Sequence, residues 1–179
     1  MHQLVIQTPR LELIAATLEM GEAELSDVSQ FARLLDAEIP ENWPPAGNDE
    51  STMKWFLDRL NENPANFGWL AWYILLKNDD QNKRTAIGDI GFKGAPDENG
   101  VVETGYGIME KFQLKGYASE ALKGILLWAF QHPELKKVIA ETDEENHASL
   151  GVLQKNNFRF AGQGSEERTV RYEIKRGGF

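Results

Sequence analysis

A short strand–turn–helix segment constrains this chain more than any other part of its sequence. Residues 101–109 have a strand-like pattern, residues 113–118 form a turn with a glycine at 116, and residues 119–131 have the spacing of an amphipathic helix. The first N–H groups of a helix lack partners within the helix, and the helix dipole is positive there. The turn therefore predicts a phosphate or pyrophosphate site, with Gly116 allowing close backbone approach. Such a turn also begins many helices for purely structural reasons.

The composition is that of an ordinary globular protein. The 179 residues suit one domain spanning residues 1–179, with 41% hydrophobic and 26% charged residues. The chain contains no cysteine, which excludes disulfides, thiolate metal sites and a cysteine nucleophile. This composition suits a reducing compartment, so we expect a cytoplasmic protein.

The net charge of −9 limits the partners that this chain can bind. A negative protein is repelled by nucleic acid and by anionic membranes, so we expect neither partner. The longest apolar run, residues 70–76, is too short to span a bilayer. The three histidines, His2, His132 and His147, are scattered, so we expect no metal site. A cationic acceptor such as an amine is electrostatically favoured, and a homodimer is left open.

The order of expected elements indicates an α+β (mixed α/β) fold. Alternating or continuous apolar patterns predict seven strands, at residues 10–16, 68–77, 86–92, 101–109, 137–142, 158–162 and 168–175. Helical spacing predicts four helices, at residues 22–35, from an N-cap at Ser51 to before Asn63, at residues 119–131 and at residues 146–155. Hairpins combined with one helical crossover exclude a doubly wound dinucleotide fold.

Five motifs in consistent order resemble those of the GCN5-related N-acetyltransferases, in the subgroup related to ribosomal-protein acetyltransferases. Residues 8–11 read Thr-Pro-Arg-Leu, residues 88–92 read Gly-Asp-Ile-Gly-Phe, and residues 103–106 read Glu-Thr-Gly-Tyr. Residues 113–121 resemble the family's coenzyme A pyrophosphate loop and helix start, and residues 146–158 resemble its Asn-x-x-Ser motif and the helix end after that motif. Together the motifs cover nearly the whole chain.

Three residues depart from the family's pattern. Gln113 replaces a commoner arginine, and Lys115 could partly supply the lost charge. Gln154 replaces a glutamate. Asn157 replaces a glycine, and asparagine is the residue that best tolerates the left-handed conformation needed where a helix ends.

The resemblance implies the acetyltransferase fold, with a central, mostly antiparallel twisted sheet of about seven strands, a splayed central strand pair and four flanking helices. It also implies acetyl-coenzyme A as co-substrate and no metal. The expected coenzyme-binding residues come from the end of the strand, the turn and a later helix start: Ile108, Met109, Glu110, Gln113, Leu114, Lys115, Gly116, Tyr117, Ala118 and Asn146.

The implied reaction moves an acetyl group onto a primary amine, either a protein N-terminus or a small molecule. Because there is no cysteine to hold the acyl group, we expect direct attack within a ternary complex. A backbone N–H near Ile108 or Met109 would stabilise the oxyanion, since Gly105 and Gly107 favour a splay there. Those glycines are also compatible with simple packing against an aromatic side chain.

Two further steps require side chains. Glu103 or Glu141 is expected to accept the proton of the amine, and Ser149 to protonate the leaving thiolate. Each has an ordinary structural interpretation, as an ion-paired glutamate or as a polar residue in a first helical turn. Trp43, in a proline-rich loop, is a candidate for lining the acceptor site.

Alternatives remain within the same fold. One uses a longer acyl donor or a small-molecule amine such as an antibiotic or polyamine. The other is a non-catalytic module that binds or senses acyl-coenzyme A.

Overall fold

The computed structural model describes residues 3–78 and 83–178 and contains one open, eight-stranded sheet with the strand order β1-β2-β3-β4-β5-β6-β8-β7. Neighbouring strands are antiparallel except for β5 and β6, which are parallel. The strands are β1 Val5–Gln7, β2 Leu11–Ala15, β3 Ala71–Asn78, β4 Lys83–Phe92, β5 Val101–Ile108, β6 Lys137–Asp143, β7 Arg159–Gln163 and β8 Thr169–Lys175.

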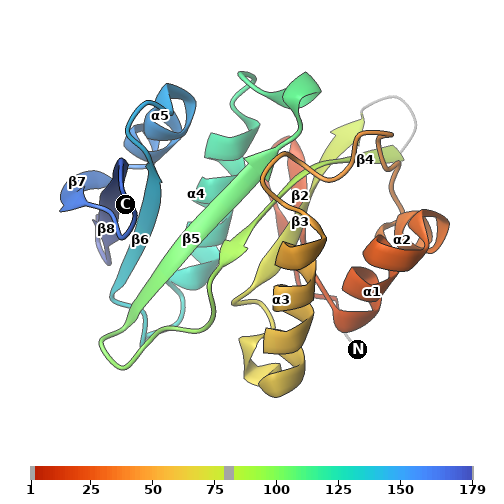
Figure 1. Cartoon of the computed structure of the whole chain (residues 1–179), viewed down its shortest axis with the longest axis horizontal. Coiled ribbons are helices and arrows are strands. Elements are labelled where there is room, and N and C mark those ends of the chain that lie inside the picture. Colours follow the sequence, from red (N-terminus) through yellow and green to blue (C-terminus); the bar gives the residue numbers. More distant parts are fainter. Residues whose placement is uncertain (1–2, 79–82, 179) are drawn as a thin grey trace.

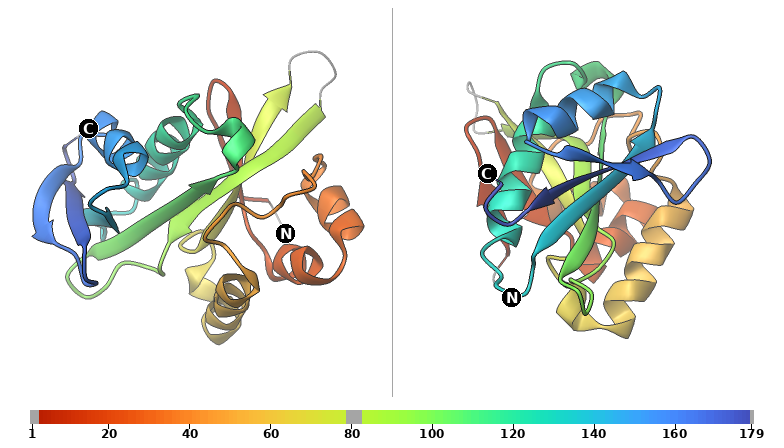
Figure 2. Two further views of the ribbon diagram at one scale, coloured as in Figure 1. Left: turned by 45° about the horizontal axis from the view of Figure 1, so that its top comes forward. Right: turned by 90° about the vertical axis from the view of Figure 1, so that its left-hand side faces the viewer.

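Helices cover both faces of the sheet (Figure 1 and Figure 2). One face carries the first three helices, and the other carries α4 and α5. The helices are α1 Leu18–Ser26, α2 Val28–Leu35, α3 Glu50–Glu62, α4 Tyr117–Ala129 and α5 His147–Lys155, with short 3₁₀ turns at Pro64–Asn66 and Glu110–Phe112. None of the helices within residues 3–78 and 83–178 is both long enough and apolar enough to cross a membrane.

Alternation along the strands creates a separate hydrophobic core on each face, since successive side chains point to opposite sides. Leu13 and Ile74 pack with α4, whereas Ile14 and Tyr73 pack with α1–α3. All four side chains are almost completely buried. β2, which holds Leu13 and Ile14, and β3, which holds Tyr73 and Ile74, therefore each contribute to both cores.

The central strand pair separates after a short stretch of pairing. β5 and β6 are in register only from Val101↔Lys137 to Glu103↔Ile139, although both strands continue beyond that point. Figure 1 shows the two strands diverging toward α5. β5 stays paired with β4 as far as Ile108 on its other edge. The predicted splay is therefore present and lies between β5 and β6.

Several predicted boundaries need correction. Residues 22–35 form two helices, because Asp27 ends α1 and its side chain caps α2. The described chain therefore has five α-helices rather than four. It has eight strands rather than seven, since the three-residue strand β1 is too short to show a pattern. The N-cap of α3 is Asp49 and not Ser51, because the Asp49 carboxylate accepts the Thr52 N–H. Most of the predicted turn at residues 78–82 lies outside the described residues.

Two asparagines finish α5. Asn157 has φ +63°, which confirms the expected left-handed position. Asn156 is buried, and its amide donates to Ser119 and to the carbonyl of Val152. This side chain joins the end of α5 to the start of α4, and so fixes one wall of the splay.

Loss of the Asp27 cap should be measurable. Asp27→Ala removes the acceptor for the Ser29 and Gln30 N–H groups, which lie 2.9 and 3.0 Å from the carboxylate oxygen. We expect urea unfolding to show a loss of about 1 kcal/mol. Asp58→Ala, which removes an exposed carboxylate inside α3, is the control and should be neutral. Equal stability of the two variants would contradict the capping role.

Candidate active site

The predicted anion-binding turn leads directly into α4. A 3₁₀ turn at Glu110–Phe112 precedes it, and Gly116 is the N-cap residue of α4 with φ +83°. Leu114 is also left-handed, at φ +60°, and its side chain is 95% exposed. Because Gly116 offers no side-chain cap, it does not occupy the first N–H groups of α4. No side chain of the N-cap residue therefore caps the start of α4, and phosphate binding there stays a prediction.

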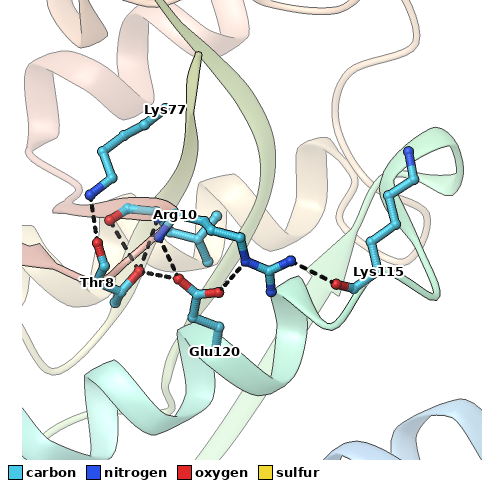
Figure 3. Close-up of polar contacts among 6 residues, drawn as sticks. Thr8, Arg10, Lys77, Lys115 and Glu120 are labelled. Carbon is cyan, nitrogen blue, oxygen red and sulfur yellow. Dashed lines mark hydrogen bonds and ion pairs between the residues drawn. The ribbon is translucent and has the colours of Figure 1, made fainter. Parts of the chain in front are cut away.

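The Thr-Pro-Arg-Leu motif holds this turn from the other end of the sequence (Figure 3). Arg10 Nε lies 2.6 Å from Glu120 Oε2, and Arg10 Nη1 donates to the Lys115 carbonyl at 3.0 Å. Thr8 Oγ1 donates to the other oxygen of Glu120 at 2.7 Å, and Lys77 donates to the Thr8 carbonyl. The Arg10 guanidinium also stacks 4.5 Å from the Tyr117 ring centre. We call Thr8, Arg10 and Glu120 the clamp.

The backbone of β5 distinguishes the two expected oxyanion donors. The Met109 N–H donates to the Ile87 carbonyl at 2.9 Å, so β4 already uses it. Hydrogen bonding alternates along an antiparallel pair, which directs the Ile108 N–H to the opposite edge of β5. That edge faces the splay. Gln113 Nε2 donates to the Ile108 carbonyl at 2.8 Å, which ties the turn to the end of β5.

A tyrosine and a serine meet across the splay. The Tyr106 hydroxyl on β5 lies 3.0 Å from Ser149 Oγ on α5. Asn146 is the N-cap of α5, and its Oδ1 accepts the Ser149 N–H at 3.0 Å. Burial raises the pKa of Tyr106, which keeps its hydroxyl protonated at neutral pH. The position one turn later, Leu153, is completely buried and carries no polar group.

Both predicted bases carry cationic partners. Glu103 Oε1 lies 2.5 Å from Lys93 Nζ. Glu141 Oε1 lies 2.6 Å from Arg171 Nη2, and its other oxygen accepts two hydrogen bonds from Ser165. Burial opposes ionisation of Glu141, but these donors outweigh burial and lower the pKa of Glu141 to about 2. At neutral pH Glu141 is therefore a weak proton acceptor.

A cavity of about 510 Å³ lies on the face of the sheet that α1 and α3 cover. Asp89 of β4 and Glu24 of α1 are the carboxylates within it, together with Asp49 where α3 begins. Trp43 donates from Nε1 to Glu24 at 2.8 Å, so it supports a wall residue rather than forming the wall itself. The cavity extends to Gly105 and Tyr106 of β5.

Reasoning from the sequence missed several of these residues. Glu24, Asp89 and the Tyr106 hydroxyl depend on contacts between elements, and Arg10 meets Glu120 across 110 positions. The motif containing Arg10 was visible, but its contact with the turn was not. The position of Asp89 between two glycines in a strand was the available signal, because a carboxylate there is unusual in a buried strand.

Comparison with known proteins identifies the family. The acetyltransferase (GNAT) domain profile matches residues 17–159. An uncharacterized N-acetyltransferase of Bacillus subtilis, YjdG, is 26% identical over 172 residues, which cover 96% of this chain and 99% of the relative.

Solved structures have the same fold. A RimL ribosomal L7/L12 alpha-N-protein acetyltransferase in complex with coenzyme A has a TM-score of 0.67 at 19% identity, covering 98% of this chain and 100% of that one. The microcin C7 self-immunity acetyltransferase MccE, in complex with acetyl-CoA and AMP, has a TM-score of 0.62 at 17% identity, covering 94% and 93%.

The clamp should contribute to stability. Glu120→Ala removes the acceptor of Thr8 and Arg10, and hydrogen bonds to a charged group contribute about 1.5–3 kcal/mol. We expect urea unfolding at pH 7 to show a loss of about 2 kcal/mol, against no change for the exposed Glu98→Ala.

The pH dependence gives a second check. Burial opposes the charge of Glu120, but hydrogen bonds from Thr8 and Arg10 outweigh it and lower its pKa. A lowered pKa stabilises the fold above the ordinary glutamate range, and this contribution is lost as the pH falls through the folded-state value. The difference between parent and Glu120→Ala should therefore narrow in acid. A difference that stays constant with pH would contradict the ion-pair account.

Proposed function

Because the chain belongs to the GNAT family and is an acetyl-CoA-dependent N-acetyltransferase, we propose that it transfers the acetyl group to a primary amine by direct attack within a ternary complex. The observation that carries this proposal is the splay between β5 and β6, with the turn at residues 113–118 at its end. Relatives of the same fold are described in complex with coenzyme A or acetyl-CoA.

The coenzyme is proposed to place its pyrophosphate on the turn. The N–H groups of residues 114–118 would donate to it, and Gly116 leaves room for its approach. Arg10 lies beside Gly116, with Nη2 3.4 Å from the place where a Cβ would stand. Glu120 neutralises Arg10 and holds it there. The remaining expected contacts, Ile108, Met109, Glu110, Gln113 and Asn146, are proposed to bind the rest of the coenzyme.

The acetyl group is proposed to lie at the splay, where the Ile108 N–H would stabilise the negative oxygen of the intermediate. The Ser149 hydroxyl, hydrogen-bonded to Tyr106, would protonate the departing thiolate. Glu103 and Glu141 stay predictions for the base, since the Lys93 and Arg171 ion pairs would have to open first. The acceptor is a primary amine of a small molecule or of a peptide.

Acetyl-CoA should stabilise the folded chain, whereas NADH and ATP should not. A ligand at about a hundred times its dissociation constant adds about 2.7 kcal/mol. We expect Gly116→Asp to abolish the shift in melting temperature, because its side chain and charge occupy the pyrophosphate position. Gly177→Asp is the matched control, since Gly177 has a similar φ of +85° and nothing within 4 Å of an added Cβ. No shift with the parent protein would reject the proposed function.

The hydroxyl pair should act as one unit. Tyr106→Phe and Ser149→Ala are each expected to lower kcat by about a hundredfold, while the coenzyme-induced melting shift stays unchanged. Because both groups belong to one proton path, the double variant should be little slower than either single variant. If kcat of both single variants stays within a few-fold of the parent value, the thiolate leaves without a proton from this hydroxyl pair.

A further inference from the structure

The cavity beside β5 combines an apolar wall with carboxylates that lack cationic partners. Its apolar side chains come from α3 and from the residue before β3: Met53, Trp55, Phe56 and Leu70. Its volume of about 510 Å³ is in the range of sites for small ligands. A ligand that fills it must therefore be compact and largely apolar, with a polar group that satisfies the carboxylates.

Asp89 lines the cavity from β4, on the sheet side. Tyr73, Asp89 and Gly107 form one cross-strand row over β3, β4 and β5, so they share the face that α1–α3 cover. Asn48 donates a hydrogen bond to Asp89. The other Asp89 oxygen lies 3.5 Å from where a Gly107 Cβ would stand. The carboxylate therefore reaches over β5, one residue away from Ile108.

Glu24 faces the same cavity from α1. Its oxygens accept hydrogen bonds from Trp43 Nε1 at 2.8 Å and from the Tyr73 hydroxyl at 2.6 Å. Within residues 3–78 and 83–178, neither Glu24 nor Asp89 forms an ion pair with lysine or arginine. Partly buried carboxylates without a cation are costly, and a bound ammonium group would compensate them.

β5 carries no side chain at Gly105 and Gly107, but only Gly105 is uncovered, because Pro45, Asn48 and Asp89 lie 3.1–3.5 Å from where a Gly107 Cβ would stand. An added Cβ on Gly105 would meet nothing within 4 Å, and Gly105 also lines the cavity. An amine held at Asp89 would therefore approach β5 at Gly105 rather than at Gly107. The expected oxyanion donor, Ile108, lies three residues further along the same strand.

We infer that Asp89 and Glu24 bind the ammonium group of the acceptor, that its compact apolar body fills the cavity, and that Asp89 takes its proton. This inference rests on the acetyl transfer proposed above. The ammonium gives one proton to the Asp89 carboxylate, and the neutral nitrogen then forms the C–N bond. The C–S bond breaks, and the thiolate takes a proton from the Ser149 hydroxyl pair. The nitrogen then releases its second proton, which passes through solvent to the hydroxyl pair and restores it. Asp89 finally releases its proton to water.

The charged groups around Asp89 support this assignment. Burial, and then the charge of Glu24, raise the pKa of Asp89 to about 7, although Asn48 partly opposes the shift. Burial also raises the pKa of Glu24. Tyr73, Asp49, Lys93 and Tyr106 are the other ionisable groups on the cavity wall. A carboxylate with a raised pKa is a stronger proton acceptor than an ordinary aspartate.

The test uses phenethylamine and a short peptide with an N-terminal phenylalanine as acceptors, with acetyl-CoA, at several pH values. Asp89→Asn should lower kcat/KM for the preferred acceptor by about a hundredfold or more, with the coenzyme-induced melting shift unchanged. Its rate should keep rising with pH as free amine accumulates. Glu24→Gln should mainly raise KM. The exposed Asp58→Asn is the control. The better of the two acceptors identifies the source of the amine.

Two readouts separate a functional role from a structural one. Because the pKa of Asp89 is raised to about 7, the protonated side chain contributes most to the stability of the fold below about pH 4. That contribution is lost as the pH rises to about 7. Above pH 7, Asp89→Asn should therefore be at least as stable as the parent. Gly105→Val keeps both carboxylates but narrows the approach, and should lower kcat/KM without changing coenzyme binding.

Three results would overturn the inference. The first is a kcat/KM of Asp89→Asn within a few-fold of the parent value, while Glu103→Gln or Glu141→Gln strongly lowers kcat/KM. The second is acetylation of polar amines only, with neither aromatic acceptor used. The third is binding of phenethylamine without coenzyme, monitored by tryptophan fluorescence, that Asp89→Asn leaves unchanged. The fluorescence measurement needs no catalysis, so it tests amine binding in the cavity even if coenzyme does not bind. A failure of coenzyme to bind would instead reject the proposed function.

Discussion

The end of hydrogen bonding between β5 and β6 after Glu103 and Ile139 is the constraint on which the site depends. β5 keeps β4 as a partner as far as Ile108, so its backbone stays rigid while its other edge is open. A buried edge must find partners for its polar groups, and a sheet interrupted in this way can offer them to a ligand. A hydrogen bond between the Tyr106 and Ser149 hydroxyls spans the gap and joins β5 to α5.

The carboxylates around the gap fall into two electrostatic classes. Glu103, Glu120 and Glu141 have lysine or arginine partners, so their charge is already compensated within the fold. Asp89 and Glu24 are held by neutral donors from Asn48, Trp43 and Tyr73. Neutral donors orient a carboxylate without cancelling its charge. The distinction separates carboxylates that already have a cationic partner from carboxylates that have none within the described residues.

Patterns local in sequence were sufficient for most of the fold, and contacts between distant elements were not. Alternation located seven strands, and the Gly116 turn and the Asn157 end of α5 followed from local backbone chemistry. The helix at 22–35 was misjudged because its apolar spacing continues through Asp27, where capping ends one helix and starts another. The partners of Glu103 and Glu141 lie on other elements, so the sequence could name these two carboxylates but not rank them, and it did not single out Asp89.

The clamp has a consequence for how the molecule opens. Thr8 and Arg10 contact Glu120 across more than a hundred positions, so the turn before α4 is ordered by the segment between β1 and β2. β1 is a three-residue edge strand, and short edges are among the first parts of a domain to fray. Local opening of that edge releases Arg10 and, with it, the carbonyl of Lys115. The order of the turn before α4 is thus linked to the segment between β1 and β2. A change at the N-terminal edge of the sheet can therefore alter this turn without a substitution in the turn itself.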